Sequence, residues 1–268
     1  MRNLDLFLKK KTTTFYYAIK LFPKDKRNDI SFLYFFLRQI DDLVDEQKNK
    51  KVFYQVKKDF FYCLKNKKKS KYEYNQMALY LIQKYQIPEV YFKDFFNTQE
   101  KDLNKKVNFS DFKQLDQYCY GVAGVIGLII SHILELGKSR EKEAVAFGNF
   151  MQMINILRDI KEDENQGKSY LPQNLLDKFK IKKNNLIKDK IKYELMIKSF
   201  CQEIKIKLKK VSFSGINWRL KFPLLLAKNT YLFIMKKICS RPLFYYYRRC
   251  QLNFLDWLFI FIKTFFYG

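Results

Sequence analysis

The stretch Met151-Gln-Met-Ile-Asn-Ile-Leu-Arg-Asp-Ile-Lys-Glu-Asp163 decides the fold that we predict for this chain. Its polar residues recur at steps of three and four, which places them on one stripe of an α-helix: Gln152, Asn155, Asp159 and Asp163. Apolar residues between them allow this stripe to face the protein interior. A second carboxylate pair, Asp41 and Asp45, lies far upstream in another apolar segment, with Arg38 one helical turn before it.

Carboxylates one helical turn apart repel each other unless a cation lies between them or water screens them. Two such pairs facing each other would concentrate negative charge, and Mg²⁺ held by a few carboxylates plus substrate phosphates is the natural complement. The alternative is a solvated helix face with ordinary ion pairs, for example between Glu162 or Asp163 and nearby lysines. Both pairs lie in apolar helices, and this favours the metal–phosphate interpretation.

The scarcity of helix breakers predicts an all-α fold. Gly121 is the first glycine, and only Pro23 and Pro88 interrupt the residues before it. Such a sequence argues against a β protein and for long helices. Hydrophobic periodicity predicts helices over about 23–46, 50–64, 72–86, 88–96, 111–136, 142–164, 177–210 and 218–238, with a last helix starting at Pro242. No repeat or flexible linker is apparent in the sequence, so we expect a single domain over residues 1–268.

Three glycines inside the predicted helix 111–136 need a specific reason. Gly121, Gly124 and Gly127 each cost a helix about 1 kcal/mol relative to alanine. Either a neighbouring helix or a ligand must approach the backbone closely there.

The composition limits the classes of ligand that this protein is expected to bind. The 52 Lys and Arg against 27 Asp and Glu leave a formal charge of +25, which attracts polyanions such as nucleic acid, anionic lipid or diphosphates. We find no helix-turn-helix, zinc-finger or RNP-type pattern, and therefore expect no specific nucleic-acid binding. The five widely spaced cysteines form no Cys-x-x-Cys pair, and His132 is the only histidine, so neither a zinc site nor a disulfide framework is expected.

The C-terminal segment 253–267 is very apolar. It is only 15 residues long and contains Asp256 and Lys263, whereas a helix that crosses a bilayer needs about 20 residues. It can pack on the domain or lie in a membrane interface with lysines toward anionic head groups. The N-terminus lacks the apolar core of a signal peptide. We expect a cytoplasmic monomer with peripheral contact on the inner face of an anionic membrane.

Four blocks, in this order, resemble the squalene/phytoene synthase family of trans-prenyltransferases over about Thr12 to Arg249. They are Thr12-Thr-Thr-Phe-Tyr16, the Arg-x-x-Asp-x-x-x-Asp pattern from Arg38 to Asp45, Tyr118-Cys-Tyr-Gly-Val-Ala-Gly124, and Asn155 to Asp163 followed by Tyr170-Leu-Pro172. The resemblance implies a class I isoprenoid synthase fold, an all-α bundle around a central cavity. It also implies head-to-head condensation of two farnesyl or geranylgeranyl diphosphates, through a cyclopropylcarbinyl diphosphate, to a squalene- or phytoene-type hydrocarbon. Mg²⁺ or Mn²⁺ would be the cofactor, and NADPH would be used only if the product is squalene.

By match to the family motifs, the metal ligands would be Asp41, Asp45, Asn155, Asp159 and Asp163. The residues that contact diphosphate would be Thr12, Thr14, Arg38, Gln152, Asn155 and Arg158. Tyr120 would sit near the reacting carbons. Two departures stand out: the threonines replace serines of many relatives, and Gly121 replaces a second tyrosine, which puts the role of that tyrosine in doubt here.

Two other functions compete with this one. A head-to-tail prenyl synthase or terpene cyclase would also carry an aspartate-rich pattern such as Asp41-Asp42-x-x-Asp45, although the Tyr-Cys-Tyr block and the Arg158-Asp159 motif speak against it. An inactive family member that serves as an assembly or binding protein would be expected to have lost metal-binding aspartates, and all four are present.

Overall fold

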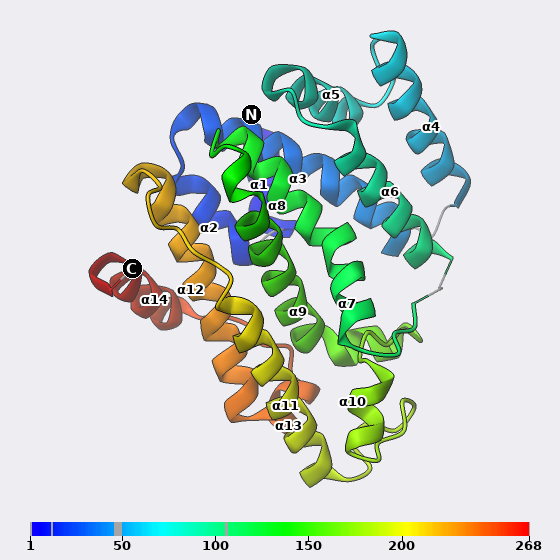
Figure 1. Cartoon of the computed structure of the whole chain (residues 1–268), viewed down its shortest axis with the longest axis vertical. Coiled ribbons are helices and arrows are strands. Elements are labelled where there is room, and N and C mark those ends of the chain that lie inside the picture. The colour runs from blue at the N-terminus through cyan, green and yellow to red at the C-terminus, as the bar shows by residue number, and fades with distance from the viewer. Residues whose placement is uncertain (1, 12, 46–49, 105–106, 268) are drawn as a thin grey trace.

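The computed structural model describes residues 2–11, 13–45, 50–104 and 107–267, and this part of the chain contains helices and no strands (Figure 1). The prediction of an all-α fold is confirmed. The α-helices are α1 (Arg2–Lys11), α2 (Thr13–Leu21), α3 (Lys24–Asp45), α4 (Lys50–Asn66), α5 (Glu73–Tyr85), α6 (Glu89–Leu103), α7 (Phe112–Cys119), α8 (Val125–Ile133), α9 (Glu141–Asn165), α10 (Gln173–Lys178), α11 (Lys190–Leu208), α12 (Trp218–Ser240), α13 (Pro242–Tyr247) and α14 (Phe254–Tyr267).

The helix that carries the polar stripe, α9, lies at the centre of the molecule (Figure 1). It packs against α7, α8, α11, α12 and α13. Its buried residues include Phe150, Met153, Ile154 and Leu157, which hold one side of the helix in the core. The stripe of polar residues on its other side is therefore fixed in direction by this packing.

Four of the predicted helices differ from the observed ones, and three of these differ in where they break or end. The helix that starts after Pro88 continues past Phe96 to Leu103. The predicted helix 177–210 is two helices, because the chain turns at 179–189 and Asp189 caps α11 by accepting a hydrogen bond from the backbone N–H of Lys192. The helix that starts at Pro242 ends at Tyr247, where Arg248 turns to an extended conformation, and α14 is separate.

The segment that was predicted as one helix over 111–136 contains a π-helical turn, Tyr120–Gly124, between α7 and α8. Its glycines are explained by close helix packing. A Cβ on Gly127 would lie 2.2 Å from the backbone oxygen of Ala144 in α9, and a Cβ on Gly121 would lie 2.0 Å from Oγ1 of Thr98 in α6. The structure thus leaves no room at Gly121 for a larger side chain.

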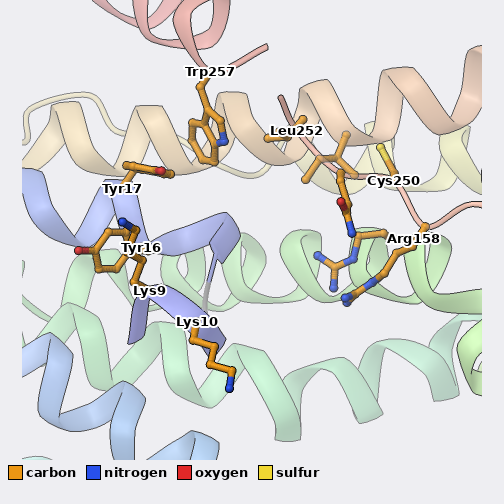
Figure 2. A pocket seen from close by; sticks show the side chains of 11 residues that line it. Lys9, Lys10, Tyr16, Tyr17, Arg158, Cys250, Leu252 and Trp257 are labelled. Carbon is orange, nitrogen blue, oxygen red and sulfur yellow. The ribbon is translucent and has the colours of Figure 1, made fainter. Parts of the chain in front are cut away.

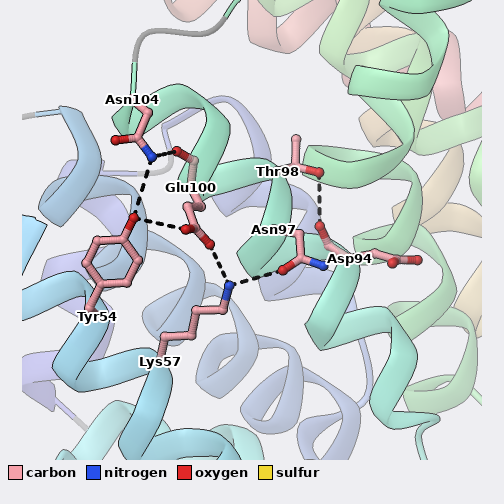
Figure 3. A network of polar contacts seen from close by, with 7 residues as sticks. All are labelled: Tyr54, Lys57, Asp94, Asn97, Thr98, Glu100 and Asn104. Carbon is pink, nitrogen blue, oxygen red and sulfur yellow. Dashed lines mark hydrogen bonds and ion pairs between the residues drawn. The ribbon is translucent and has the colours of Figure 1, made fainter.

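Helix α6 is held from outside by a polar network with α4 (Figure 3). Nζ of Lys57 donates to Asn97 at 3.0 Å and to Glu100 at 2.7 Å, and the hydroxyl of Tyr54 donates to Glu100 at 2.9 Å. These contacts fix the rotation of α6. Its opposite face, with Gln99 and Asp102, is thereby directed toward α3 and α7.

Helix α14 packs along α12 at the edge of the molecule (Figure 1). Nδ2 of Asn229 donates to Oγ1 of Thr264 at 2.9 Å, and Lys237 forms an ion pair with Asp256 at 2.6 Å. Among the described residues, no helix combines the length and the apolar character needed to span a membrane.

Candidate active site

A cleft of about 520 Å³ lies between α3, α6, α7 and α9. Its charged lining is balanced, with five cationic and five acidic side chains among the described residues. They are Lys10, Arg38, Arg158, Lys168 and Arg249, together with Asp41, Asp102, Asp159, Glu162 and Asp163. The structure therefore brings one carboxylate of the upstream motif and both carboxylates of the downstream motif to one cavity.

The α9 wall of the cleft is built around Asp159. Nε and Nη2 of Arg158 donate to its two carboxylate oxygens at 2.8 and 2.6 Å, and Nε of Arg249 donates at 2.8 Å. Burial alone would raise the pKa of Asp159, but these arginines hold it below its ordinary value. Asp159 is consequently ionised at neutral pH, and two guanidinium groups are assembled beside it.

Gln152 and Asn155 extend this wall by one helical turn. Nδ2 of Asn155 donates to Oε1 of Gln152 at 3.2 Å, so the two amides fix each other. Oδ1 of Asn155 is buried and has no partner at hydrogen-bonding distance among the described residues, although the hydroxyl of Tyr231 lies close enough to interact with this amide. A buried acceptor of this kind, in a cavity, is expected to have a partner that is not part of the chain.

On the α3 wall, Asp41 accepts a hydrogen bond from Nε2 of Gln99 at 2.7 Å. Arg38 forms an ion pair with Asp42 at 2.8 Å, one turn along the same helix. Arg38 and Asp41 both line the cleft, so the upstream motif supplies one acid and one guanidinium group to it.

Of the two tyrosines in the Tyr-Cys-Tyr block, Tyr118 lines the cleft and Tyr120 does not. The hydroxyl of Tyr118 donates to Asp102 at 2.6 Å, whereas that of Tyr120 donates to Asp94 at 3.2 Å. Residues two apart face opposite sides of a helix, and Val122, four after Tyr118, shares the cleft face. Burial, and then the charge of Asp102, raises the pKa of Tyr118 well above its ordinary value, which keeps its hydroxyl protonated.

The cleft continues into a second cavity of about 320 Å³, with which it shares its charged and polar residues Lys10, Arg38, Asp41, Gln152, Asn155, Arg158 and Arg249. The residues that this cavity adds beyond the cleft are apolar or aromatic and define what we call the apolar chamber: Phe15, Tyr34, Leu37, Ala123, Ile126, Gly127, Ile130, Met151 and Tyr231. Ile130 and Met151 also line a further apolar pocket of about 40 Å³, together with Phe147 and Phe213. The cavity thus has a charged mouth and an apolar end.

A side pocket of about 440 Å³ opens from the charged mouth toward α14 (Figure 2). It shares Lys10, Arg158 and Arg249 with the cleft. Trp257 reaches into it from α14, with its ring 4.6 Å from that of Tyr17 in α2. The side pocket therefore connects the C-terminal helix with the charged residues of the cleft.

Three predicted site residues cannot be placed in this cavity. Thr12 lies outside the described residues, and the side chains of Thr14 and Asp45 do as well, although the backbones of these two belong to α2 and α3. Among the side chains that are described, no three of His, Cys, Asp and Glu lie together as a metal site. The donor set of the cleft nevertheless fits a hard divalent cation that is also bound by substrate phosphates, because Oδ1 of Asn155 lies there with the carboxylates of Asp41, Asp159 and Asp163.

Several cleft residues were not predicted from the sequence. Gln99 and Asp102 continue the buried stripe of Phe92, Phe95 and Phe96 at helical spacing, and extending the predicted α6 by one and a half turns would have found them. Arg249 gives no local signal. It contacts a residue 90 positions away, and only the turn between α13 and α14 brings it to the cleft.

Comparison with known proteins identifies the class of fold and then the family. The structure is similar to that of a dehydrosqualene synthase in complex with a ligand, with a TM-score of 0.87 and 22% identity over 99% of this chain and 95% of that one. It is also similar to a squalene synthase from Alicyclobacillus acidocaldarius, with a TM-score of 0.77 and 18% identity over 90% and 92% of the two chains. The fold is that of these helical synthases.

A sequence model of the squalene/phytoene synthase family matches residues 8–249, and the chain belongs to this family. Relatives include a 15-cis-phytoene synthase from Synechocystis sp., 28% identical over 202 residues, and one from Synechococcus elongatus, 29% identical over 188 residues. Each match covers 65% of this chain, and 56% and 61% of the two relatives. The chain thus spans about three fifths of the length of these relatives.

Proposed function

We propose that this chain is a prenyltransferase that joins two prenyl diphosphates head to head, through a cyclopropylcarbinyl diphosphate, to a hydrocarbon of the squalene or phytoene type. One observation carries the proposal. Acidic residues of α3 and α9 line one cleft with Arg38, Arg158 and Arg249, and this cleft leads into an apolar chamber. An amphiphilic substrate with a charged head and an apolar tail matches this arrangement.

The charged mouth would bind the diphosphates. Arg38, Arg158 and Arg249 are the donors, since a guanidinium group forms forked contacts with phosphate oxygens. Asp41, Asn155, Asp159 and Asp163 would hold Mg²⁺, or Mn²⁺, together with Asp45, which follows Asp41 by one turn. The metal would neutralise charge that develops on the leaving diphosphate.

Arg158 and Arg249 have a second task in this scheme. In the structure described here they neutralise Asp159. If Asp159 served as a metal ligand, Arg158 and Arg249 would be able to pair with the diphosphate instead. Their charges would then be balanced both before and after the substrate binds, which would limit the cost of desolvation.

The apolar chamber would hold the prenyl chains and exclude water from the allylic cation. The aromatic faces of Phe15, Tyr34 and Tyr231 line it, and such faces stabilise a cation electrostatically. Burial raises the pKa of Tyr34 and of Tyr231, so neither carries a negative charge that would capture the cation. Tyr118, also protonated, is the tyrosine of the Tyr-Cys-Tyr block that borders the reaction space.

Incubation of the purified protein with farnesyl or geranylgeranyl diphosphate tests the proposal. Each reaction contains Mg²⁺, with or without NADPH, and a parallel set contains isopentenyl diphosphate. The expected product is a hydrocarbon whose carbon number is twice that of the substrate, and its mass, with its dependence on NADPH, distinguishes squalene from dehydrosqualene or phytoene.

Two results would overturn the proposal. A longer diphosphate, formed only with isopentenyl diphosphate, would identify a head-to-tail synthase. Tight binding of the diphosphates without any turnover, with Mg²⁺ or Mn²⁺ present, would identify a binding protein of this fold.

A further inference from the structure

Helix α14 has its faces reversed relative to an ordinary surface helix. Its inner face, against α12, carries Asp256, Ile260 and Thr264, and two of these three are polar. Its outer stripe consists of large apolar residues that are 43–78% exposed: Phe254, Leu255, Leu258, Phe261, Ile262 and Phe265. These residues follow one another at steps of one, three and four, which places them on one side of the helix. A surface helix normally turns its apolar side inward.

The outer stripe forms one continuous apolar surface, and not scattered single residues. Phe259 and Phe266 flank it and are also exposed. Contiguous apolar surface of this kind on a protein marks a site that another molecule or a membrane covers. Some of the aromatic residues also touch the edge of α12, since the rings of Phe261 and Phe265 lie 5.6 and 6.3 Å from that of Phe222 and the ring of Phe259 lies 5.7 Å from that of Phe233. Each of these three residues of α14 is nevertheless at least 43% exposed.

The charges around the stripe decide which occupant fits. Lys263 projects from the helix itself, and Arg241 and Arg248 are exposed in the chain just before it. Lys236 is exposed on α12, next to the Lys237–Asp256 pair that holds α14. An apolar helix face with aromatic residues and a cationic rim is the pattern of a helix that lies in the interface of an anionic membrane.

The membrane also fits the position of α14 in the molecule. Trp257 of α14 and Leu252 line the side pocket, which shares Lys10, Arg158 and Arg249 with the cleft (Figure 2). A molecule that enters the side pocket from beside α14 meets apolar groups and then the guanidinium groups. This order matches an amphiphile that leaves a bilayer.

We propose that the outer stripe of α14 rests in the interface of an anionic phospholipid bilayer and that the side pocket opens there. With 14 residues the helix is too short to cross a bilayer, so it lies in the interface plane. The entry route for prenyl diphosphates rests on the proposed function. The docking surface itself does not.

Sedimentation with large unilamellar vesicles tests the docking surface without any substrate. The vesicles contain phosphatidylcholine alone or phosphatidylcholine with phosphatidylglycerol. The test variant carries Leu255→Ser, Leu258→Ser and Ile262→Ser, three exposed aliphatic residues of the outer stripe. The control variant carries Ile191→Ser, Leu195→Ser and Ile206→Ser, three exposed apolar residues of α11. We expect the unmodified chain and the control to bind the anionic vesicles, and the test variant to bind at least about a hundredfold more weakly.

A charge reversal tests the electrostatic contribution to vesicle binding and leaves the apolar residues of the outer stripe unchanged. Lys263→Glu should weaken binding to anionic vesicles about fivefold or more, and Lys198→Glu on α11 should not. Binding that is equal for neutral and anionic vesicles, or equal for the test and control variants, would overturn the proposal.

The oligomeric state separates the membrane from a second copy of the chain. Light scattering of the lipid-free protein should give the same mass for the test and control variants. A dimer that the three α14 substitutions dissociate, with no vesicle binding, would assign the outer stripe to a protein interface instead. Circular dichroism of each variant confirms that it is folded, and turnover of detergent-dispersed substrate reports the proposed enzymatic function independently.

Discussion

Helices α9 and α14 both break the rule that polar side chains face water and apolar ones face the interior, but in opposite senses. Helix α9 turns Gln152, Asn155 and Asp159 inward, and most of these polar atoms have partners within the chain. Helix α14 turns Leu258, Ile262 and their neighbours outward. The inward stripe is thus held in place by its own chain, whereas the outward stripe contributes little until something covers it.

The difference predicts how each helix responds to substitution. Changes in the stripe of α9 should alter chemistry, ion pairing and stability, because its side chains are both buried and coupled. Changes at Leu258 and Ile262 in the stripe of α14 should alter only association. The following predictions test this contrast, beginning with the largest expected effect.

Replacement of the cleft carboxylates should abolish turnover. We expect Asp41→Asn and Asp159→Asn each to lower kcat by about a thousandfold or more, because a neutral amide binds a divalent cation and its diphosphate far less well. Steady-state product formation measures this effect, with Asp177→Asn on the exposed part of α10 as control. Full activity in both variants would remove these residues from the site.

The same two variants should differ in stability. An asparagine at position 41 still accepts the hydrogen bond from Gln99, so Asp41→Asn should lower the free energy of unfolding by less than Asp159→Asn does. An asparagine at position 159 leaves Arg158 buried beside a neutral partner, which should cost about 1–3 kcal/mol. Urea denaturation measures both. If the two variants lost the same free energy of unfolding, the Arg158–Asp159 ion pair would contribute no more to stability than the Gln99–Asp41 hydrogen bond.

The polar face of α9 should tolerate no added atom at Gly148, one turn before Gln152. A Cβ on Gly148 would lie 2.1 Å from the backbone oxygen of Ala123, so Gly148→Ala should destabilise the protein by about 1–3 kcal/mol, although alanine is normally the better helix former. Gly124→Ala is the graded control, because the nearest atom there is the side-chain Oδ1 of Asn149, at 2.7 Å, which can move. Thermal unfolding that ranks Gly124→Ala as the more damaging change would contradict this packing.

The sequence predicted those features of the fold and the site that depend on the local spacing of residues. Spacing of polar and apolar residues gave α3 and α9, and with them Arg38, Asp41, Arg158 and Asp159, which the structure brings to one cleft. It also gave the apolar character of α14. It could not give the direction in which α14 faces, because Asp256 and Thr264 turn inward only through their partners Lys237 and Asn229 on another helix.

The remaining differences have the same cause. Tyr120 was assigned to the reacting carbons by its place in a motif, but the rotation of the helix around Gly121, which packs on Thr98, directs Tyr118 to the cleft instead. Arg249 reaches Asp159 through the turn after α13. Such contacts between distant segments leave no periodic signal, and only the assembled helices show them. The single-domain arrangement, the metal and the monomeric state remain predictions.

The ion pair between Arg249 and Asp159 should make stability depend on pH in one direction. The pKa of Asp159 in the folded protein is below its ordinary value, so the pair stabilises the fold above the unfolded pKa and loses this contribution as the pH falls through the folded pKa. Arg249→Ala should therefore lower the free energy of unfolding by about 0.5–1 kcal/mol near neutral pH, and the difference should shrink below about pH 4. Half-exposed Arg249 limits the size of the effect.

Urea titrations at several pH values measure this difference, and the Asp159→Asn background is the control. In that background Arg249→Ala removes a hydrogen bond to a neutral amide and the contact with Glu162 at 3.3 Å, so no part of the difference comes from titration of residue 159. A difference that grows as the pH falls would show that Arg249 acts through a group other than Asp159.

The smallest expected effect tests most directly whether the outer stripe of α14 is uncovered in the lipid-free protein. Leu258 is 46% exposed and Ile260, two residues later on the other face, is 1% exposed. In lipid-free solution Leu258→Ser should change the free energy of unfolding by less than about 0.5 kcal/mol, whereas Ile260→Ser should cost about 2 kcal/mol or more, because it removes a buried side chain and inserts a hydroxyl. Urea denaturation at low protein concentration measures both. If Leu258→Ser were as destabilising as Ile260→Ser, the outer stripe would already be covered in the free protein. Helix α14 would then not differ from α9 in the way described above.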